Sequence, residues 1–180
     1  MKMRKAVLLA GLALMFGAGT ASAAPNAEKF GLGYQGIFGG DILQGISGRY
    51  WIDNNWGAEL NVFYGTIGVQ KNGVDVFDAD LLLGTVKVLY APVVKTNSRF
   101  YVGLEGGLGT VGSDSLEGAD VSLWTINPLI GAEYSFSDIP ELGLNFEVGY
   151  KFHHVSVDAA DDYDVNLDGT FVSLGAHYYF

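Results

Sequence analysis

The sequence contains no cysteine, so no disulfide bond can hold its fold together. It also lacks any apolar run that approaches the 18 residues of a membrane-spanning helix after its first two dozen residues. Cations are scarce. Of the 10 Lys and Arg, three stand at Lys2, Arg4 and Lys5, which leaves seven against 20 Asp and Glu. The chain after Lys5 therefore has a formal charge of −13 and would repel phosphates, which argues against a nucleic-acid-binding protein.

The N-terminus has the three parts of a secretory signal peptide. The three cations precede an apolar run from Ala6 to about Ala18, and the small residues 21–23 (Ala-Ser-Ala) follow. This order is typical of a leader that is cleaved on export. We therefore predict a signal peptide over residues 1–23 and one mature domain over residues 24–180; the alternative is an N-terminal anchor helix.

The mature part shows a period of two rather than a helical period. Apolar and polar residues alternate in segments of about ten residues, separated by turn residues, which is typical of a transmembrane barrel. The eight segments are 29–38, 44–52, 56–67, 79–92, 99–110, 120–136, 141–154 and 169–180. The predicted fold is all-β: an eight-stranded antiparallel transmembrane β-barrel, connected as an up-and-down meander.

The connections between these segments alternate in length. Residues 53–55, 93–98 and 137–140 are short and turn-like. The stretches 68–78, 111–119 and 155–168 are longer, with a shorter one at 39–43. Short turns at the periplasmic end and longer loops outside are typical of outer-membrane barrels.

The two faces of each segment differ in chemistry. In segment 141–152 the even positions are Leu, Phe, Val and Tyr, whereas Asn145, Glu147 and Lys151 share the other face. An apolar outside and a polar inside indicate lipid as the outer solvent. A soluble lipocalin-like barrel is the alternative, but it would require apolar residues on the face that carries these charges.

Aromatic residues near the segment ends predict two girdles at the membrane interfaces. The inner girdle would contain Tyr50, Trp56, Tyr90, Phe100, Tyr134 and Tyr178. The outer girdle would contain Phe38, Tyr64, Trp124, Phe152 and Phe171.

The last strand carries a family resemblance. Ser-Leu-Gly-Ala-His-Tyr-Tyr-Phe over residues 173–180 resembles the C-terminal strand of outer-membrane β-barrels, which ends in an aromatic residue. The resemblance implies that Tyr178 and Phe180 form the signal for the barrel-assembly machinery. The whole chain also resembles the small-barrel family that includes the membrane domain of outer-membrane protein A and outer-membrane protein X.

Seven charged residues share the inward face of the segments. They are Arg49, Glu59, Lys87, Glu105, Glu133, Glu147 and Lys151. An eight-stranded barrel is just wide enough for side chains to fill, so we expect a salt-bridged plug that closes the lumen. The alternative is a narrow or gated ion path, that is, a small pore.

Carboxylates are dense in the predicted outer loops. Residues 158–169 contain Asp164-x-Asn166-x-Asp168-Gly, which matches the first half of a calcium loop. Gly175 stands where an EF-hand requires a bidentate Glu, so an EF-hand is rejected and no metal site is predicted. Divalent cations could still bridge these loops to anionic lipid headgroups, although a solvated acidic loop is the simpler interpretation.

A possible hydrolytic site lies at the outer end of the last two segments. His154 and Ser156 share the lipid-facing side with Asp168, and this pattern resembles the outer-membrane lipid A deacylase family. The resemblance would make Ser156 the nucleophile, His154 the base and Asp168 the orienting acid. Val157 replaces the family's Asn and Asp168 its Glu, which weakens the match.

The expected protein is therefore an integral protein of a bacterial outer membrane with a structural or surface-interaction role. We expect it to be non-catalytic and monomeric, without a cofactor, and in contact with outer-membrane lipids and lipopolysaccharide. An outer-leaflet acyl hydrolase and a small pore are the alternatives.

Overall fold

The computed structural model describes residue 26 and residues 29–39, 41–71, 74–112, 120–158 and 163–180. The predicted signal peptide, residues 1–23, lies outside these residues. Eight strands account for nearly all of the described chain. They are β1 (Phe30–Gly39), β2 (Asp41–Trp51), β3 (Trp56–Lys71), β4 (Val74–Lys95), β5 (Ser98–Gly112), β6 (Asp120–Phe136), β7 (Ile139–Asp158) and β8 (Tyr163–Tyr179).

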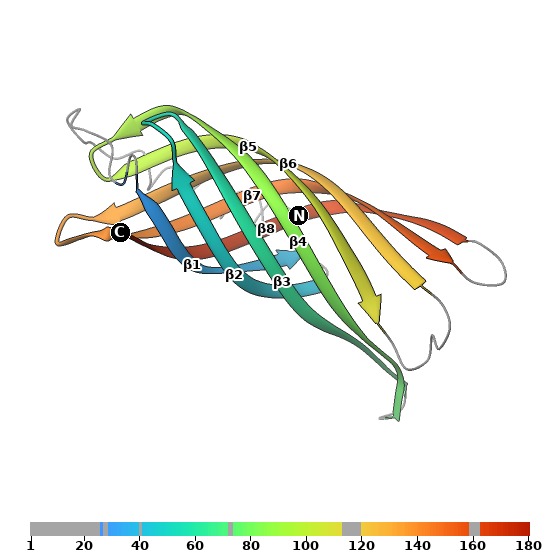
Figure 1. The fold of residues 1–180 in the computed structure, drawn as a ribbon. Helices are drawn as coiled ribbons and strands as arrows, with labels where there is room; N and C mark the ends of the chain where they lie inside the picture. The colour runs from blue at the N-terminus through green and yellow to red at the C-terminus, as the bar shows by residue number, and fades with distance from the viewer. Residues whose placement is uncertain (1–25, 27–28, 40, 72–73, 113–119, 159–162) are drawn as a thin grey trace, which may run out of the picture.

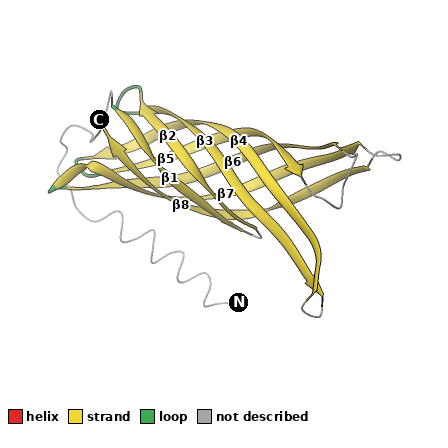
Figure 2. Ribbon diagram, turned by 60° about the horizontal axis from the view of Figure 1, so that its bottom comes forward, coloured by secondary structure: helices red, strands yellow, loops and turns green. Residues whose placement is uncertain are grey.

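The strands form one closed antiparallel barrel in sequence order, as predicted. Each strand pairs with the next, and β8 returns to pair with β1, with Leu32 opposite Tyr178. The strands run obliquely around the barrel, and the tight turns gather at one end (Figures 1 and 2). Because the ring is closed, no strand has an edge that is open along its whole length. Among the described residues, no helix is long and apolar enough to cross a membrane.

The turns between β2 and β3, β4 and β5, and β6 and β7 are short, as predicted. At the other end three of the four predicted loops are too long, whereas the predicted loop 111–119 agrees with the interval between β5 and β6 to within two residues. β3 continues to Lys71 and β4 begins at Val74; β7 continues to Asp158 and β8 begins at Tyr163. Only residue 40 separates β1 from β2. The β3–β4 hairpin therefore projects beyond the wall formed by β1 and β2 (Figure 1).

The polarity of the two barrel faces explains this error. Over most of the barrel the outward residues are apolar: Leu60 is 59% exposed and Leu108 74%. Towards the loop end the outward residues become polar, as at Thr66, Asp80 and Ser122, while Leu81 and Leu123 are buried inside. The strands therefore continue beyond the apolar region, with polar residues outward and apolar residues inward. A rule that requires apolar residues on the outward face ends each predicted strand too early.

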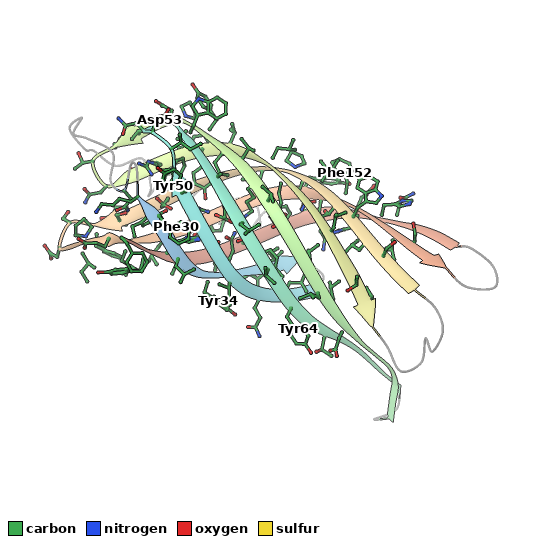
Figure 3. The ribbon with its side chains drawn as sticks, in the orientation of Figure 1. Phe30, Tyr34, Tyr50, Asp53, Tyr64 and Phe152 are labelled. Atoms are coloured by element: carbon green, nitrogen blue, oxygen red, sulfur yellow. The ribbon has the colours of Figure 1, made fainter. Side chains whose placement is uncertain are left out.

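The aromatic girdles lie largely where they were predicted. Phe30 and Tyr50 project outward nearer the turn end, and Tyr64 and Phe152 project outward nearer the loop end (Figure 3). Phe171 is an exception, because it is 3% exposed and points inward. A Cβ on Gly149 would lie 2.5 Å from its ring, so Gly149 is what makes room for Phe171 in the lumen.

Asp53 shapes the turn between β2 and β3, at the turn end of the barrel (Figure 3). Its Oδ1 accepts hydrogen bonds from the backbone N–H groups of Trp56 and Asn55, at 2.6 Å and 2.7 Å. These bonds favour the charged form and hold the pKa of Asp53 below its usual value.

We therefore expect Asp53→Asn to remove a pH-dependent contribution to stability. A lowered folded-state pKa stabilises the fold above the pKa of the unfolded aspartate, near 3.9, and this gain disappears as the pH falls through the folded value. The free energy of unfolding of wild type and variant should therefore differ at pH 7 and converge at low pH. A difference that is constant with pH would contradict the role of these bonds.

Candidate functional site

The inward-facing charges form an alternating row across four neighbouring strands. Arg49 on β2 lies opposite Glu59 on β3, Glu59 lies opposite Lys87 on β4, and Lys87 lies opposite Glu105 on β5. All four residues are at most 2% exposed. Directly opposite residues in a sheet are close enough for their side chains to interact. The register of the barrel therefore places each charge next to one of opposite sign.

Glu147 on β7 connects this row to the far wall of the lumen. Its Oε1 accepts from Nη2 of Arg49 at 3.0 Å and from the Tyr101 hydroxyl at 2.9 Å. Its Oε2 accepts from Nζ of Lys87 at 2.7 Å. Gln35 and Ser173 also donate to Oε2, each at 2.9 Å. Five donors from five other strands thus converge on one carboxylate.

The two central cations share four carboxylates. Arg49 forms ion pairs with Glu59, with Glu133 at 2.9 Å and with Glu147. Lys87 forms ion pairs with Glu59 at 2.8 Å, Glu147 at 2.7 Å and Glu105 at 3.6 Å. Burying charges is costly unless they are paired and hydrogen-bonded, and this network supplies both.

Lys151 lies at the loop-side border of the central network. It is half-buried and lines a small internal cavity of about 20 Å³ with Glu105, Asn127 and His153. A cavity of this size is large enough for a single water molecule. Lys151 therefore faces the lumen, as the alternation predicts, but nearer the loop end than the other six predicted charges.

A second layer of side chains fills the lumen towards the loop end. It consists of large apolar side chains that point inward and are at most 8% exposed: Ile37, Leu43, Phe63, Leu81, Leu83, Leu123 and Phe171. The internal cavity lies between this apolar layer and the ion-pair network, since residues of both layers line it.

Sequence reasoning missed several polar residues of the lumen. Arg99 is 1% exposed, its guanidinium carbon lies 4.2 Å from the ring centre of Trp51, and its Nη1 lies 3.9 Å from Oε1 of Glu133. Tyr179 donates to Oε2 of Glu133 at 2.6 Å. Both residues lie inside the predicted segments 99–110 and 169–180 and have the inward parity of their strands, so applying the alternation to every position of these segments would have found them.

The predicted hydrolytic residues lie towards the loop end of β7 and β8. Nδ1 of His154 lies 2.8 Å from Oδ1 of Asn166, which is directly opposite it on β8. Asp168 is opposite Phe152 in the same ladder. The β7–β8 register therefore places Asp168 two residues nearer the turn end than His154, and Asp168 as the orienting acid stays a prediction.

Of the carboxylates in the predicted outer loops 111–119 and 155–168, Asp114, Glu117, Asp161 and Asp162 lie outside the described residues. Within the described part of the chain, no group of three or more His, Asp or Glu side chains could hold a metal ion. The end of the predicted assembly signal is described. Tyr178 and Phe180 project outward, 49% and 70% exposed, with ring centres 5.3 Å apart.

Comparison with known proteins shows a likeness of structure rather than sequence. No protein-family profile and no curated protein sequence matches the chain. The outer membrane protein OprG from Pseudomonas aeruginosa is similar, with a TM-score of 0.61, 18% identity, and coverage of 89% of this chain and 99% of OprG. The outer membrane protein AlkL, whose structure was solved in DMPC lipid bilayers, has a TM-score of 0.57 and 17% identity, over 91% of this chain and 95% of AlkL. The chain has the fold of these small outer-membrane β-barrels.

Proposed function

We propose that the chain is an integral protein of a bacterial outer membrane, with a closed lumen and a structural or surface-interaction role. The observation that carries this proposal is the combination of a filled, ion-paired interior with an apolar exterior. An exposed apolar surface that surrounds a barrel would drive a soluble protein to aggregate, whereas lipid is its natural solvent.

Location and biogenesis belong to the same proposal. Residues 1–23 direct export and are removed, and the C-terminal strand, which ends in Tyr178 and Phe180, is read by the barrel-assembly machinery. The similarity to OprG and AlkL, both described as outer membrane proteins, supports this location. Cell fractionation tests it: the protein should stay in the outer-membrane fraction after urea washing. Recovery in the soluble fraction would contradict the proposal.

The barrel should serve as a rigid support in the membrane rather than as a channel for ions or solutes. Its partners are outer-membrane lipids and lipopolysaccharide, and the ends of the strands at the loop end contact the exterior. Divalent cations could bridge the exposed carboxylates there, such as Asp80 and Asp168, to anionic headgroups. The chain acts as a monomer and requires no cofactor.

We expect no discrete conductance steps when the purified protein is inserted into a planar lipid bilayer. The lumen is blocked by the ion pairs of Arg49 and Lys87 and again by the apolar layer around Phe63 and Phe171. A porin reconstituted in the same way serves as the positive control. Steps in the wild type that change when Lys87 is replaced by Gln would contradict the closed lumen and favour the small pore.

A further inference from the structure

The small internal cavity beside Lys151 has the size and the lining of a site for one water molecule. Its volume is about 20 Å³, which is large enough for a water molecule but not for a hydrated ion. Side chains of the apolar layer form one part of its wall. The polar part comes from three neighbouring strands: Glu105 on β5, Asn127 on β6, and Lys151 and His153 on β7. A buried water usually makes about three hydrogen bonds, so this wall offers enough partners for one.

Glu105 is the carboxylate of the ion-pair network whose nearest cation in that network is farthest away. Its Oε1 accepts a hydrogen bond from Nδ2 of Asn127 at 2.6 Å, and its Oε2 accepts one from the Thr85 hydroxyl at 3.1 Å. Nζ of Lys87 lies 3.6 Å from Oε2, too far for a hydrogen bond, whereas the same Nζ lies 2.7 Å from Glu147. Each carboxylate oxygen can accept two hydrogen bonds, so Glu105 can accept a further one from a donor in the cavity.

The balance of charge in the lumen gives Lys151 a role. Among the described residues, the buried charged side chains are four carboxylates and the three cations Arg49, Lys87 and Arg99. With histidine counted as neutral, this buried set has an excess of one negative charge. Uncompensated buried charge is costly. Lys151 is half-buried on the wall of the cavity, where it supplies the compensating positive charge.

The register of β6 and β7 brings two of the polar groups to the same side of the cavity. The ladder of these described strands is interrupted at Asn127 and Pro128, because a proline has no N–H to donate. The register is the same before and after the interruption, so Asn127 lies opposite Lys151. Side chains that lie directly opposite each other on one face of a sheet are neighbours. The amide of Asn127 and the ammonium of Lys151 can therefore contact the same ligand.

We propose that the cavity binds one water molecule, which bridges the ammonium of Lys151 and the carboxylate of Glu105. The water accepts a hydrogen bond from Lys151 and donates one to Glu105, and the amide of Asn127 offers it a third contact. The two opposite charges thus interact through the water, and Lys151 becomes the last member of the ion-pair network. The proposal deepens the proposed function and rests on it, since only a closed lumen keeps a single water apart from the solvent.

A crystal structure of the wild-type mature protein, at a resolution that shows ordered waters, tests the site directly. We expect one peak of density in the cavity, within about 3.2 Å of both Nζ of Lys151 and an oxygen of Glu105. An empty cavity, or direct contact between these two side chains, would overturn the proposal and leave the closed lumen intact. A peak surrounded by six or more oxygen atoms would overturn it in favour of a metal cation. A continuous column of water through the lumen would instead overturn the proposed function itself.

A cycle of single and double variants tests the link between the two charges in a lipid bilayer. Lys151→Met removes the ammonium but keeps an unbranched side chain, and Glu105→Gln removes the negative charge but keeps the volume. Each should lower the urea concentration at which half of the protein is unfolded in phosphatidylcholine vesicles. The double variant should lose clearly less than the sum of the two losses, because the second change removes a charge whose partner is already absent.

Glu141→Gln provides the matched control for this cycle. Glu141 lies on the same strand as Lys151 but does not line the cavity, so the same chemical change there should be independent of Lys151. The losses caused by Lys151→Met and Glu141→Gln should therefore add in the double variant. If the losses caused by Lys151→Met and Glu105→Gln add just as fully, the water-mediated link is overturned. The crystallographic test uses the wild type, so it decides the proposal even if one of these variants does not fold.

Discussion

Glu147→Ala should lower the free energy of unfolding by about 3–5 kcal/mol, the usual consequence of breaking a buried ion pair from one side. Glu147 is fully buried and accepts hydrogen bonds from Arg49 and Lys87. Without it, both cations stay in the lumen with fewer carboxylates, and the Tyr101 hydroxyl loses an acceptor. The lost side chain also leaves a cavity, which adds to the loss of stability.

Urea unfolding in phosphatidylcholine vesicles, followed by tryptophan fluorescence, measures this effect. Glu147→Gln keeps the volume and removes the charge, so it should fall between wild type and Glu147→Ala. Glu141→Ala removes a carboxylate from the same strand close to its turn and should change stability by no more than about 0.5 kcal/mol. If Glu147→Ala proved as mild as Glu141→Ala, the ion-pair network would not hold the lumen together.

The second large effect concerns the level at which the membrane ends. Leu60→Arg, in the middle of the apolar exterior, should destabilise the folded protein by about 2–4 kcal/mol. Thr66→Arg, six residues along the same strand and on the same face, should cost at most about 1 kcal/mol. Oδ1 of Asp80 accepts a hydrogen bond from Thr66 at 3.0 Å, so an arginine there gains a neighbouring carboxylate.

The same unfolding measurement compares the two variants, because each introduces one arginine into β3. Equal and large losses would mean that lipid also surrounds the polar end of the barrel, and the inversion of polarity would not mark the membrane boundary. Equal and small losses would mean that neither position faces lipid. The second result would contradict the membrane-spanning function.

The period of two in the sequence was sufficient to predict the fold. Side chains point alternately to the two faces of a strand. If lipid surrounds the barrel, an apolar residue points outward, and the residues next to it in the sequence must then point into the lumen. For this reason Glu59 and Glu147 could be assigned to the lumen from parity alone. At Thr66 and Asp80 the strands leave the apolar layer and the rule that links polarity to direction reverses, so the predicted segments stopped at residue 67 and began at residue 79 although β3 and β4 continue.

Contacts across the lumen could not be predicted in this way. Parity shows that Arg49 points inward, but its pairing with Glu133 depends on how far two non-adjacent strands are staggered around the barrel. The partner of His154 depends on register in the same way: a shift of two residues would have brought Asp168 beside it instead of Asn166. Register is determined by the whole set of turns and bulges, which one segment of sequence does not contain.

The pairing of β1 with β8 also has a consequence for how the protein is made. Gly33 and His177 are neighbours in the ladder although almost the whole domain separates them along the chain. The first strand to be synthesised therefore keeps an unpaired edge until the last one arrives, and such distant contacts form slowly. During that interval the unpaired edge of β1 is the part of the chain most prone to pair with a wrong partner. Protecting this edge until β8 arrives is therefore the step of assembly at which the protein most needs an assembly factor.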